Sequence, residues 1–408
     1  LDGKNACWVP GTDHASIATE AKVVRWLREE KKLRKADLTR EQFMEYAYQW
    51  KDKYGGIILQ QLRRLGASCD WQRTAFTMDK GYYEDCVRMF VDLYQKGKLY
   101  RGLRMVNWDP EAKTVLSNEE VLYNEEQAQL FYIKYLLEGS DSEGIVIATQ
   151  RPETIFADVA VAVNPNDKRY QHLVGKNVRI PLLDRPIPVI ADDYVDVEFG
   201  TGALKITPAH DPNDYEIGLR HNLPVLDTIA DDGSINDQCA FAPIVGLDRF
   251  EARKRMKPLL EESGNLVKLE DYVTKIGRSE RTNSVVEPKL SLQWFVRMTD
   301  LGAPALKAVL DREVQFYPDN FQNLYRNWME NLRDWCISRQ LWWGQRIPAW
   351  YLQAEGLNKE TQIFVAESAE AALEQARKAT GNANLTLADL RQDEDVLDTW
   401  ASSWLWPI

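Results

Sequence analysis

The amino-acid sequence predicts an α/β protein in which a β-rich module is inserted into a largely helical frame. The first part of the chain carries apolar residues at helical spacing, and the middle consists of short β-branched runs between turn residues. The last part, from residue 323, is dense in aromatic and basic residues and predicts a packed core. At 408 residues the chain exceeds one hydrophobic core, since domains usually hold roughly 100 to 200 residues. The length is compatible with two or three domains, and we interpret the chain as two.

Two helices are predicted near the beginning of the chain. The stretch from Ala15 to Lys32 is rich in helix-forming residues. A second helix is expected after Thr39, because Gln42 three residues later completes a capping-box pattern. Its apolar residues then recur at helical spacing as far as Leu65, which predicts one continuous helix that Gly66 ends.

The β-rich module is expected to begin near Glu143. The runs GIVIAT, RIPLL and RPIPVIA are typical of strands, and the turn residues NPND separate the first two. In YVDVEFG, the apolar residues Val195, Val197 and Phe199 alternate with acidic ones. This period of two predicts a further, half-buried strand.

Composition and charge exclude several classes of protein. The formal net charge of −11 argues against broad adhesion to nucleic acid, although basic clusters at 31–35 and 249–257 leave local binding open beside plain solvation. The chain has no run of 18 apolar residues, so no membrane span is expected. The opening LDGKNACWVPGTDHAS resembles neither a secretory signal nor a natural start. Five scattered cysteines without a CxxC pair favour a reducing cytoplasm over a disulfide framework.

The segment GTGALKITPAHDPNDYEIG, residues 200–218, carries the first candidate chemistry. Its glycines allow a close backbone approach, and Asp211 followed by Pro212 predicts a helix N-cap with proline at the first helical position. Asp214 then falls at the third helical position. The two carboxylates either cap the helix and complement its dipole, or hold an ammonium group of a substrate.

The segment TQRPET, at the end of the predicted strand GIVIAT, carries the second group of candidate functional residues. Thr149, Arg151 and Thr154 leave the strand end together, and their hydroxyl and guanidinium groups suit a polar ester substrate. A turn with internally satisfied hydroxyls is the alternative. His210 lies beside the first motif, where a neutral imidazole can equally serve a structural role. Residue spacing reveals no Ser-His-Asp or Cys-His arrangement.

Taken together, these motifs resemble the valyl-tRNA synthetase family of class I aminoacyl-tRNA synthetases. The resemblance rests on the stretches VPGTDHASIATEAKVV, NWDP, TQRPETIFADVAVAVNP, GTGALKITPAHDPNDYEIGLRHNLP, ISRQLWWGQRIPAWY and DVLDTWASSWLWP. PGTDHAS favours the valyl branch over its isoleucyl and leucyl relatives. The resemblance implies a Rossmann-type synthetic domain, residues 1–124 and 334–408, split by an inserted β-rich α/β editing domain, connective peptide 1, with its connecting segments at 125–333.

The resemblance implies that the insertion hydrolyses threonyl-tRNA(Val). A hydrophobic pocket rejects threonine in place of valine by only about 10²-fold, a value established for valyl enzymes, so a second, hydrolytic site is needed. Asp211 and Asp214 would hold the threonyl amino group or order the attacking water. By the same resemblance, the ester, the terminal adenosine and the water would be contacted by Thr149, Arg151 and Thr154. The editing pocket would be shaped by Phe199, Lys205, Thr207 and His210. In the synthetic site, valine would be bound by Asp13 and Trp400.

Departures from the family pattern limit these expectations. The HIGH and KMSKS signatures are absent, so this chain alone should not activate valine, a step for which the full-length enzyme uses ATP and Mg²⁺. Ser279 and Thr282 stand where many relatives carry a CxxC pair, so no zinc is expected, and editing needs no cofactor. The implied partners are tRNA(Val) and its valyl or threonyl group, with the chain a monomer. The alternatives are a non-catalytic tRNA-binding scaffold and the editing domain of an isoleucyl or leucyl relative.

Overall fold

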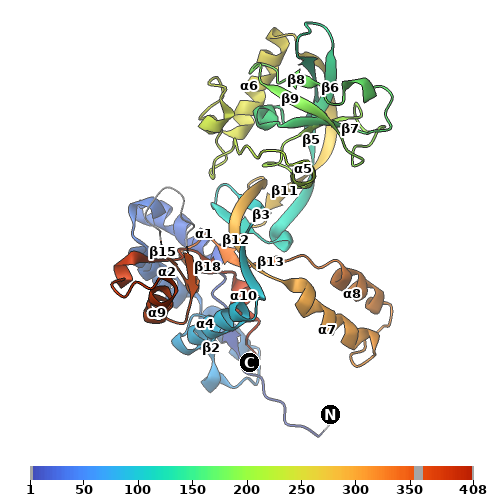
Figure 1. Cartoon of the computed structure of the whole chain (residues 1–408). Helices are drawn as coiled ribbons and strands as arrows, with labels where there is room; N and C mark the ends of the chain where they lie inside the picture. The colour runs from blue at the N-terminus through green and yellow to red at the C-terminus, as the bar shows by residue number, and fades with distance from the viewer. Residues whose placement is uncertain (1–2, 353–361, 407–408) are drawn as a thin grey trace. The chain divides into compact units, whose positions relative to one another are not determined.

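The computed structural model describes residues 3–352 and 362–406, which form two compact units. Unit 1 combines Leu1–Gly102 with Leu292–Ile408, and unit 2 is the continuous segment Leu103–Ser291. The chain enters and leaves unit 2 along β3 (Leu99–Asp109) and β12 (Glu287–Val296), which belong to one sheet of order β13-β12-β3-β4 (Figure 1). The mixed α/β composition agrees with the predicted fold class. The Rossmann assignment and the functional boundaries at 124 and 333 stay predictions.

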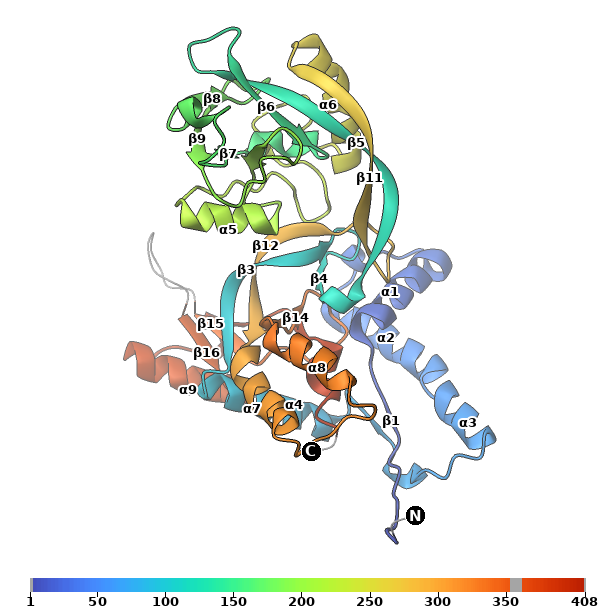
Figure 2. The same ribbon diagram turned by 90° about the vertical axis from the view of Figure 1, so that its right-hand side faces the viewer.

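Unit 2 is built on a curled seven-stranded sheet of order β10-β7-β9-β8-β5-β11, with β6 also paired to β5. The long antiparallel strands β5 and β11 pair from Val121 opposite Ser279 to Ile133 opposite Leu266, and they curve together (Figure 2). The curl brings β6 beside β10. The strands of this sheet are β5 (Val121–Leu137), β6 (Gly144–Thr149), β7 (Ala160–Val163), β8 (Asn177–Arg179), β9 (Pro186–Ala191), β10 (Ala203–Ile206) and β11 (Leu266–Ser279).

Two α-helices in unit 2 begin at aspartate caps. The Asp211 carboxylate accepts the amide hydrogens of Asn213 and Asp214 at the start of α5 (Pro212–Arg220), which confirms the predicted cap and the position of Asp214. Asp248 caps α6 (Arg249–Glu262) in the same way. The main core of the unit lies between the sheet and α6, where Ile133, Ile147 and Met256 are fully buried.

One strand predicted for this unit is wrong. The residues YVDVEFG, 194–200, form turns and bends. Asp192 accepts the amide hydrogen of Tyr194, and Asp196 accepts that of Glu198, so carboxylates take up backbone donors that a strand would give to its neighbour. Alternating charge therefore marks a polar loop here. The predicted strands GIVIAT and RPIPVIA are confirmed as β6 and β9, whereas RIPLL contributes only its first residue to β8.

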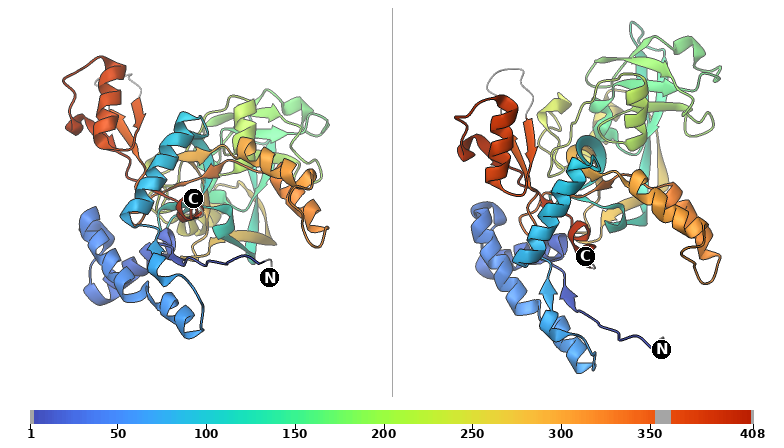
Figure 3. Two further views of the ribbon diagram at one scale, coloured as in Figure 1. Left: turned by 90° about the horizontal axis from the view of Figure 1, so that it is seen from below. Right: turned by 60° about the horizontal axis from the view of Figure 1, so that its bottom comes forward.

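Unit 1 is largely helical, as the sequence predicts. Thr39 and Gln42 form the predicted capping box, but Gly55 and Gly56 divide the predicted continuous helix into α2 and α3, because adjacent glycines are poor helix formers. Helices α7 and α8 lie side by side (Figure 3). The helices of this unit are α1 (Ser16–Trp26), α2 (Arg40–Tyr54), α3 (Ile57–Arg64), α4 (Lys80–Gln95), α7 (Met298–Leu310), α8 (Phe321–Glu330), α9 (Ala369–Thr380) and α10 (Thr399–Ser403).

Short strands connect these helices. Two of the sheets are pairs: β1 (Gly11–Thr12) with the parallel β2 (Ala75–Phe76), and β14 (Ser338–Arg339) with β18 (Val396–Leu397). A third sheet consists of β15 (Ala349–Leu352), β16 (Gln362–Val365) and β17 (Leu390–Gln392). The sheet of β3 and β12 is completed by β4 (Thr114–Leu116) and β13 (Trp335–Cys336). Trp294, Trp343 and Trp350 are buried as predicted for the aromatic region, but Trp328 and Trp404 are exposed. Among the described residues, no helix is both long and apolar enough to cross a membrane.

Candidate active site

The two predicted carboxylates lie together at the start of α5. Asp211 uses its carboxylate as the helix cap, so the capping role is real. Asp214, the third residue of α5, binds the segment that precedes the helix: its Oδ2 accepts the amide hydrogen of Thr207 at 2.9 Å. The segment from Thr207 to Asp211, which joins β10 to α5, is therefore a tight loop.

Asp214 sits in surroundings unusual for a carboxylate. Its side chain is buried, with 5% of the residue exposed. Burial raises its pKa to about 7, and the neighbouring Asp211 adds to the rise, while Lys205 and the Thr207 amide oppose it. A carboxyl group that titrates near neutral pH can exchange a proton with water under physiological conditions.

Lys205 and Thr207, which both act on Asp214, belong to a buried cluster with Tyr135 and Asp158, two residues that the sequence did not identify as candidates. We call Tyr135, Asp158, Lys205 and Thr207 the Lys205 cluster. Asp158 accepts hydrogen bonds from Thr207 Oγ1 at 2.8 Å, from Tyr135 Oη at 2.6 Å and from Lys205 Nζ at 3.2 Å, and Lys205 also donates to Thr207. Tyr135 and Asp158 are fully buried polar groups, and burial raises the pKa of each.

The TQRPET segment forms a compact turn into the 3-10 helix Pro152–Ala157. Thr149 Oγ1 accepts the Arg151 amide hydrogen at 3.1 Å, and Thr154 Oγ1 donates to the Arg151 carbonyl at 2.9 Å. Both hydroxyls therefore hold the Arg151 backbone in place. Their predicted contact with a substrate stays a prediction.

The Arg151 side chain is fixed by acidic partners. Its guanidinium donates to Glu287 at 2.6 Å and to Glu153 at 3.3 Å, and Arg249 and Arg253 pair with the same two carboxylates. Although burial opposes it, the charges of Glu287 and Glu153 raise the pKa of Arg151 above its usual value. About a quarter of the Arg151 side chain stays exposed, so a positively charged group is presented in a fixed orientation.

His210 is buried and neutral. Burial, followed by the charges of Arg151, Lys205 and Lys289, lowers its pKa well below the usual value. Its Nε2 accepts the amide hydrogen of Thr228 at 3.2 Å, which places the ring proton on Nδ1. His210 therefore has the backbone hydrogen bond that a structural role requires.

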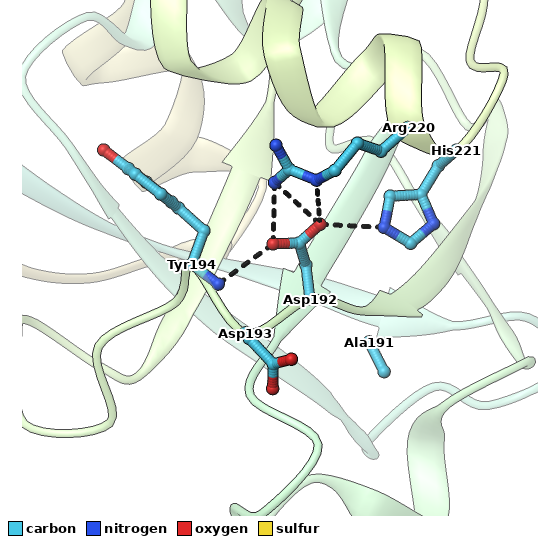
Figure 4. A pocket seen from close by; sticks show the side chains of 6 residues that line it. All are labelled: Ala191, Asp192, Asp193, Tyr194, Arg220 and His221. Atoms are coloured by element: carbon cyan, nitrogen blue, oxygen red, sulfur yellow. Dashed lines mark hydrogen bonds and ion pairs between the residues drawn. The ribbon is translucent and has the colours of Figure 1, made fainter.

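An open hollow lies next to α5. It is lined by Ala191, Asp192, Asp193, Tyr194, Arg220 and His221, and Figure 4 shows the Asp192 carboxylate at its centre. Arg220, His221 and the Tyr194 amide all donate to Asp192, which leaves that carboxylate with its charge compensated. Tyr194 lies near the two candidate carboxylates. Burial is the main cause of the raised pKa of its phenol, and the charges of Asp211 and Asp214 add to the rise.

Phe199 is the most exposed of the predicted pocket residues, and its role stays a prediction. It lies in the loop before β10, and 69% of it is exposed. The loop turns tightly because Gly200 and Gly202 adopt positive φ, and a Cβ at Gly202 would meet the Val197 carbonyl at 3.0 Å and the Arg169 side chain at 2.3 Å. The glycines noted in the sequence are thus required by backbone geometry.

Comparison with known proteins identifies the family of the chain. The family model described as "tRNA synthetases class I (I, L, M and V)" matches residues 1–408. The chain belongs to the class I tRNA synthetases. Curated relatives of this class I synthetase chain are named valine–tRNA ligases: those of Bacteroides fragilis, Parabacteroides distasonis and Chlorobaculum tepidum are 58%, 57% and 54% identical over all of this chain. The chain spans 43% to 45% of the length of these relatives.

A solved leucyl enzyme also matches at low similarity. It is a leucyl-tRNA synthetase of Agrobacterium radiobacter, in a ternary complex with tRNA and LeuAMS, with 18% sequence identity and a TM-score of 0.31 over 98% of this chain and 55% of that one. A likeness at this level carries no further inference. The assignment to class I synthetases rests on the family model.

In this class I synthetase chain, the two predicted valine-binding residues both lie near α10 in unit 1. The Asp13 carboxylate accepts from the Ser403 side chain, and burial, partly opposed by its hydrogen bond from the Ala15 amide, raises its pKa, with Asp398 adding to the rise. Trp400 begins that helix under the Asp398 cap, yet 74% of it is exposed. Their roles stay predictions.

Ser279 and Thr282, where the resemblance implied a CxxC pair in relatives, both form hydrogen bonds. Thr282 Oγ1 donates to Asp109 at 2.7 Å, and Ser279 Oγ accepts the Arg281 amide hydrogen. Within residues 3–352 and 362–406, no group of three or more His, Cys, Asp or Glu side chains could hold a metal ion. The expectation that no zinc binds stays a prediction.

Proposed function

We propose that unit 2 hydrolyses the ester bond of threonyl-tRNA(Val). The observation that carries the proposal is Asp214, a buried carboxylate with a pKa near 7 that lies beside Asp211 and a fixed Lys205. Arg151, whose side chain is about a quarter exposed, supplies a positive charge from the TQRPET turn. Such a set can order one water, bind an ammonium group and stabilise a developing negative charge. The 54% to 58% identity to valine–tRNA ligases supports the choice of tRNA(Val).

In the proposed reaction, a water oxygen attacks the ester carbonyl carbon while its proton passes to the Asp214 carboxylate. The bond from that carbon to the ribose oxygen then breaks, and the ribose oxygen takes up a proton. The products are threonine and tRNA with a free terminal hydroxyl. Asp211 faces the threonyl ammonium, Arg151 and the hydroxyls of Thr149 and Thr154 face the ester and terminal adenosine, and no covalent enzyme intermediate forms.

Selection of threonine follows from the buried polar groups. The Lys205 ammonium uses two of its three donors on Asp158 and Thr207, and it offers the third to the threonine hydroxyl. Thr207 and His210 shape this part of the pocket, with Phe199 at its edge. A valyl group carries a methyl group at that position and would leave the third donor buried without a partner, which costs about 1–3 kcal/mol. Valyl-tRNA(Val) should therefore be spared.

The remaining roles concern the longer protein that the relatives represent. That protein would attach valine to tRNA(Val) with ATP and Mg²⁺, using Asp13 for the valine amino group and Trp400 for its side chain. We propose a cytoplasmic location, a monomeric state, and neither zinc nor another cofactor for the editing step. ATP-dependent chemistry is assigned to that longer protein alone.

The test is hydrolysis of aminoacyl-tRNA by the 408-residue chain. Threonyl-tRNA(Val), valyl-tRNA(Val) and valyl-tRNA(Ile) carrying labelled amino acids are compared for release of the label. Release from threonyl-tRNA(Val) alone supports the proposal, whereas release from valyl-tRNA(Ile) indicates an isoleucyl-type editing site. Binding of tRNA(Val) without any release indicates a non-catalytic scaffold and contradicts the proposal.

A further inference from the structure

Asp158 is a buried acidic residue that the proposed reaction does not use directly. It lies between the 3-10 helix Pro152–Ala157 and β7, with none of its surface exposed. Three donors converge on it, from Tyr135, Thr207 and Lys205. Burial raises the pKa of Asp158, and the three donors, one of them an ammonium group, oppose this rise because they bind the ionised carboxylate.

Thr207 connects Asp158 to the candidate catalytic carboxylate. Its hydroxyl donates to Asp158 at 2.8 Å, while its amide donates to Asp214 at 2.9 Å. The two aspartates are therefore joined through one residue, by two hydrogen bonds. A change in the position of the Thr207 side chain is passed to the backbone that orients Asp214.

Lys205 connects the same two carboxylates electrostatically. The groups that face Asp214 are Lys205 from β10, Asp211 from its own cap and Asp158 from the segment before β7, and Tyr194 from the polar loop lies near enough to respond to it. Asp158 lowers the effective charge of Lys205 through their contact at 3.2 Å. With that partner removed, the ammonium would act on Asp214 at full strength, and the pKa of Asp214 would fall.

We propose that Asp158 is a positioning residue that fixes the Lys205 ammonium and the Thr207 hydroxyl beside Asp214 and thereby sets the pH range in which the site hydrolyses its ester. This rests on the proposed editing function. Asp158 touches no substrate. It acts through Lys205 and Thr207, and Tyr135 holds it from the opposite side.

The test compares Asp158→Asn with a matched control, Asp109→Asn, in the 408-residue chain. Asp109 is also fully buried in unit 2 and also accepts three hydrogen bonds, from Glu111, Ala112 and Thr282, none of which belongs to the candidate site. Threonine release from threonyl-tRNA(Val) is measured between pH 5.5 and 8.5, with a range of about three units chosen to span the raised pKa of the site.

We expect Asp158→Asn to lower the maximal rate by about 10- to 100-fold, because Lys205 and Thr207 lose their fixed positions. The rising part of the pH profile should also move down by about one pH unit, since a carboxylate is removed and the ammonium is released toward Asp214. Asp109→Asn should change neither quantity. An unshifted profile for Asp158→Asn would overturn the inference while leaving the editing function intact.

A second measurement does not depend on activity. The chain is labelled with ¹³C at the aspartate carboxyl carbons, the Asp214 signal is assigned by its loss in Asp214→Asn, and its titration is followed in the wild-type and Asp158→Asn chains. An unchanged titration midpoint of Asp214 overturns the inference about Asp158, whether or not the chain hydrolyses threonyl-tRNA(Val). Absence of hydrolysis contradicts the editing proposal instead. If Asp158→Asn does not fold, Tyr135→Phe removes one donor to Asp158 and should slow release by about 2- to 10-fold; no change in rate would then overturn the inference.

Discussion

The two units differ in how their candidate sites are assembled. In unit 2, the candidate residues come from one continuous segment, lie mostly buried, and are held by hydrogen bonds and ion pairs to residues of the same unit. In unit 1, Asp13 and Trp400 come from the two ends of the sequence, and Trp400 is largely exposed. A site whose members support one another within a single segment can keep its geometry independently, whereas a site assembled from distant segments depends on the packing of the whole unit.

The strongest test of this difference is Asp214→Ala. Removal of the carboxylate should lower threonyl-tRNA(Val) hydrolysis by about 10²- to 10⁴-fold, the usual contribution of a positioned proton acceptor. The matched control is Glu216→Ala, which removes an exposed carboxylate from the same helix, α5, and should leave the rate unchanged. Equal rates for the two variants would show that the site lies elsewhere.

Asp398→Ala should destabilise unit 1 by about 3–5 kcal/mol, because it removes the carboxylate that pairs with the buried guanidinium of Arg339. Every tryptophan except Trp108 lies in unit 1, so urea unfolding followed by tryptophan fluorescence reports on this unit. Hydrolysis by unit 2 should continue under native conditions. A parallel loss of hydrolysis would break the contrast between the two units.

Glu153→Gln should destabilise unit 2 by about 2–3 kcal/mol, less than the loss in unit 1, because its partners Arg151 and Arg253 are about a quarter exposed and can reach water. Hydrogen–deuterium exchange should become faster in peptides from 103–291 and stay unchanged in peptides from 1–102. Uniformly faster exchange would contradict independent support of the two sites.

The pH dependence of hydrolysis should follow the ionisation of Asp214. Because burial raises the pKa of this acid to about 7, the ionised, proton-accepting form is lost as the pH falls through 7. The rate, corrected for uncatalysed hydrolysis, should fall by about tenfold between pH 8 and pH 6. Asp214→Asn should show no such step, and a profile that rises toward low pH would exclude Asp214 as the proton acceptor.

The smallest expected effect is at the first turn of α2. Thr39→Ala removes the hydroxyl that accepts the Gln42 amide hydrogen and should cost unit 1 about 1 kcal/mol. The effect should appear in fluorescence-detected unfolding and leave the hydrolytic rate unaltered. Gln42→Ala, which removes the other half of the box, should give a loss of similar size; a larger one would show that Gln42 has a further role.

Local signals explain what could be predicted from the sequence. The caps at Thr39 and Asp211 were predictable because a cap depends on neighbours two or three residues away. The strand predicted at 194–200 was wrong because the same alternation of acidic and apolar residues occurs where aspartates bind nearby amides. Asp158 was not identified because its partners lie 23, 47 and 49 residues away, and residue spacing carries no trace of contacts at that range.

Strand β10 divides its residues between two tasks. Leu204 and Ile206 point into an apolar core with Ile217, whereas Lys205 and Thr207 point toward Asp158. Consecutive side chains of a strand face opposite ways, so the two sets occupy separate environments. Under the proposed function, Lys205 and Thr207 face the editing site, so substitutions there should change which aminoacyl-tRNA is hydrolysed, whereas substitutions at Leu204 and Ile206 should change the stability of the apolar core. A mutant library that varies each pair separately would compare these two effects.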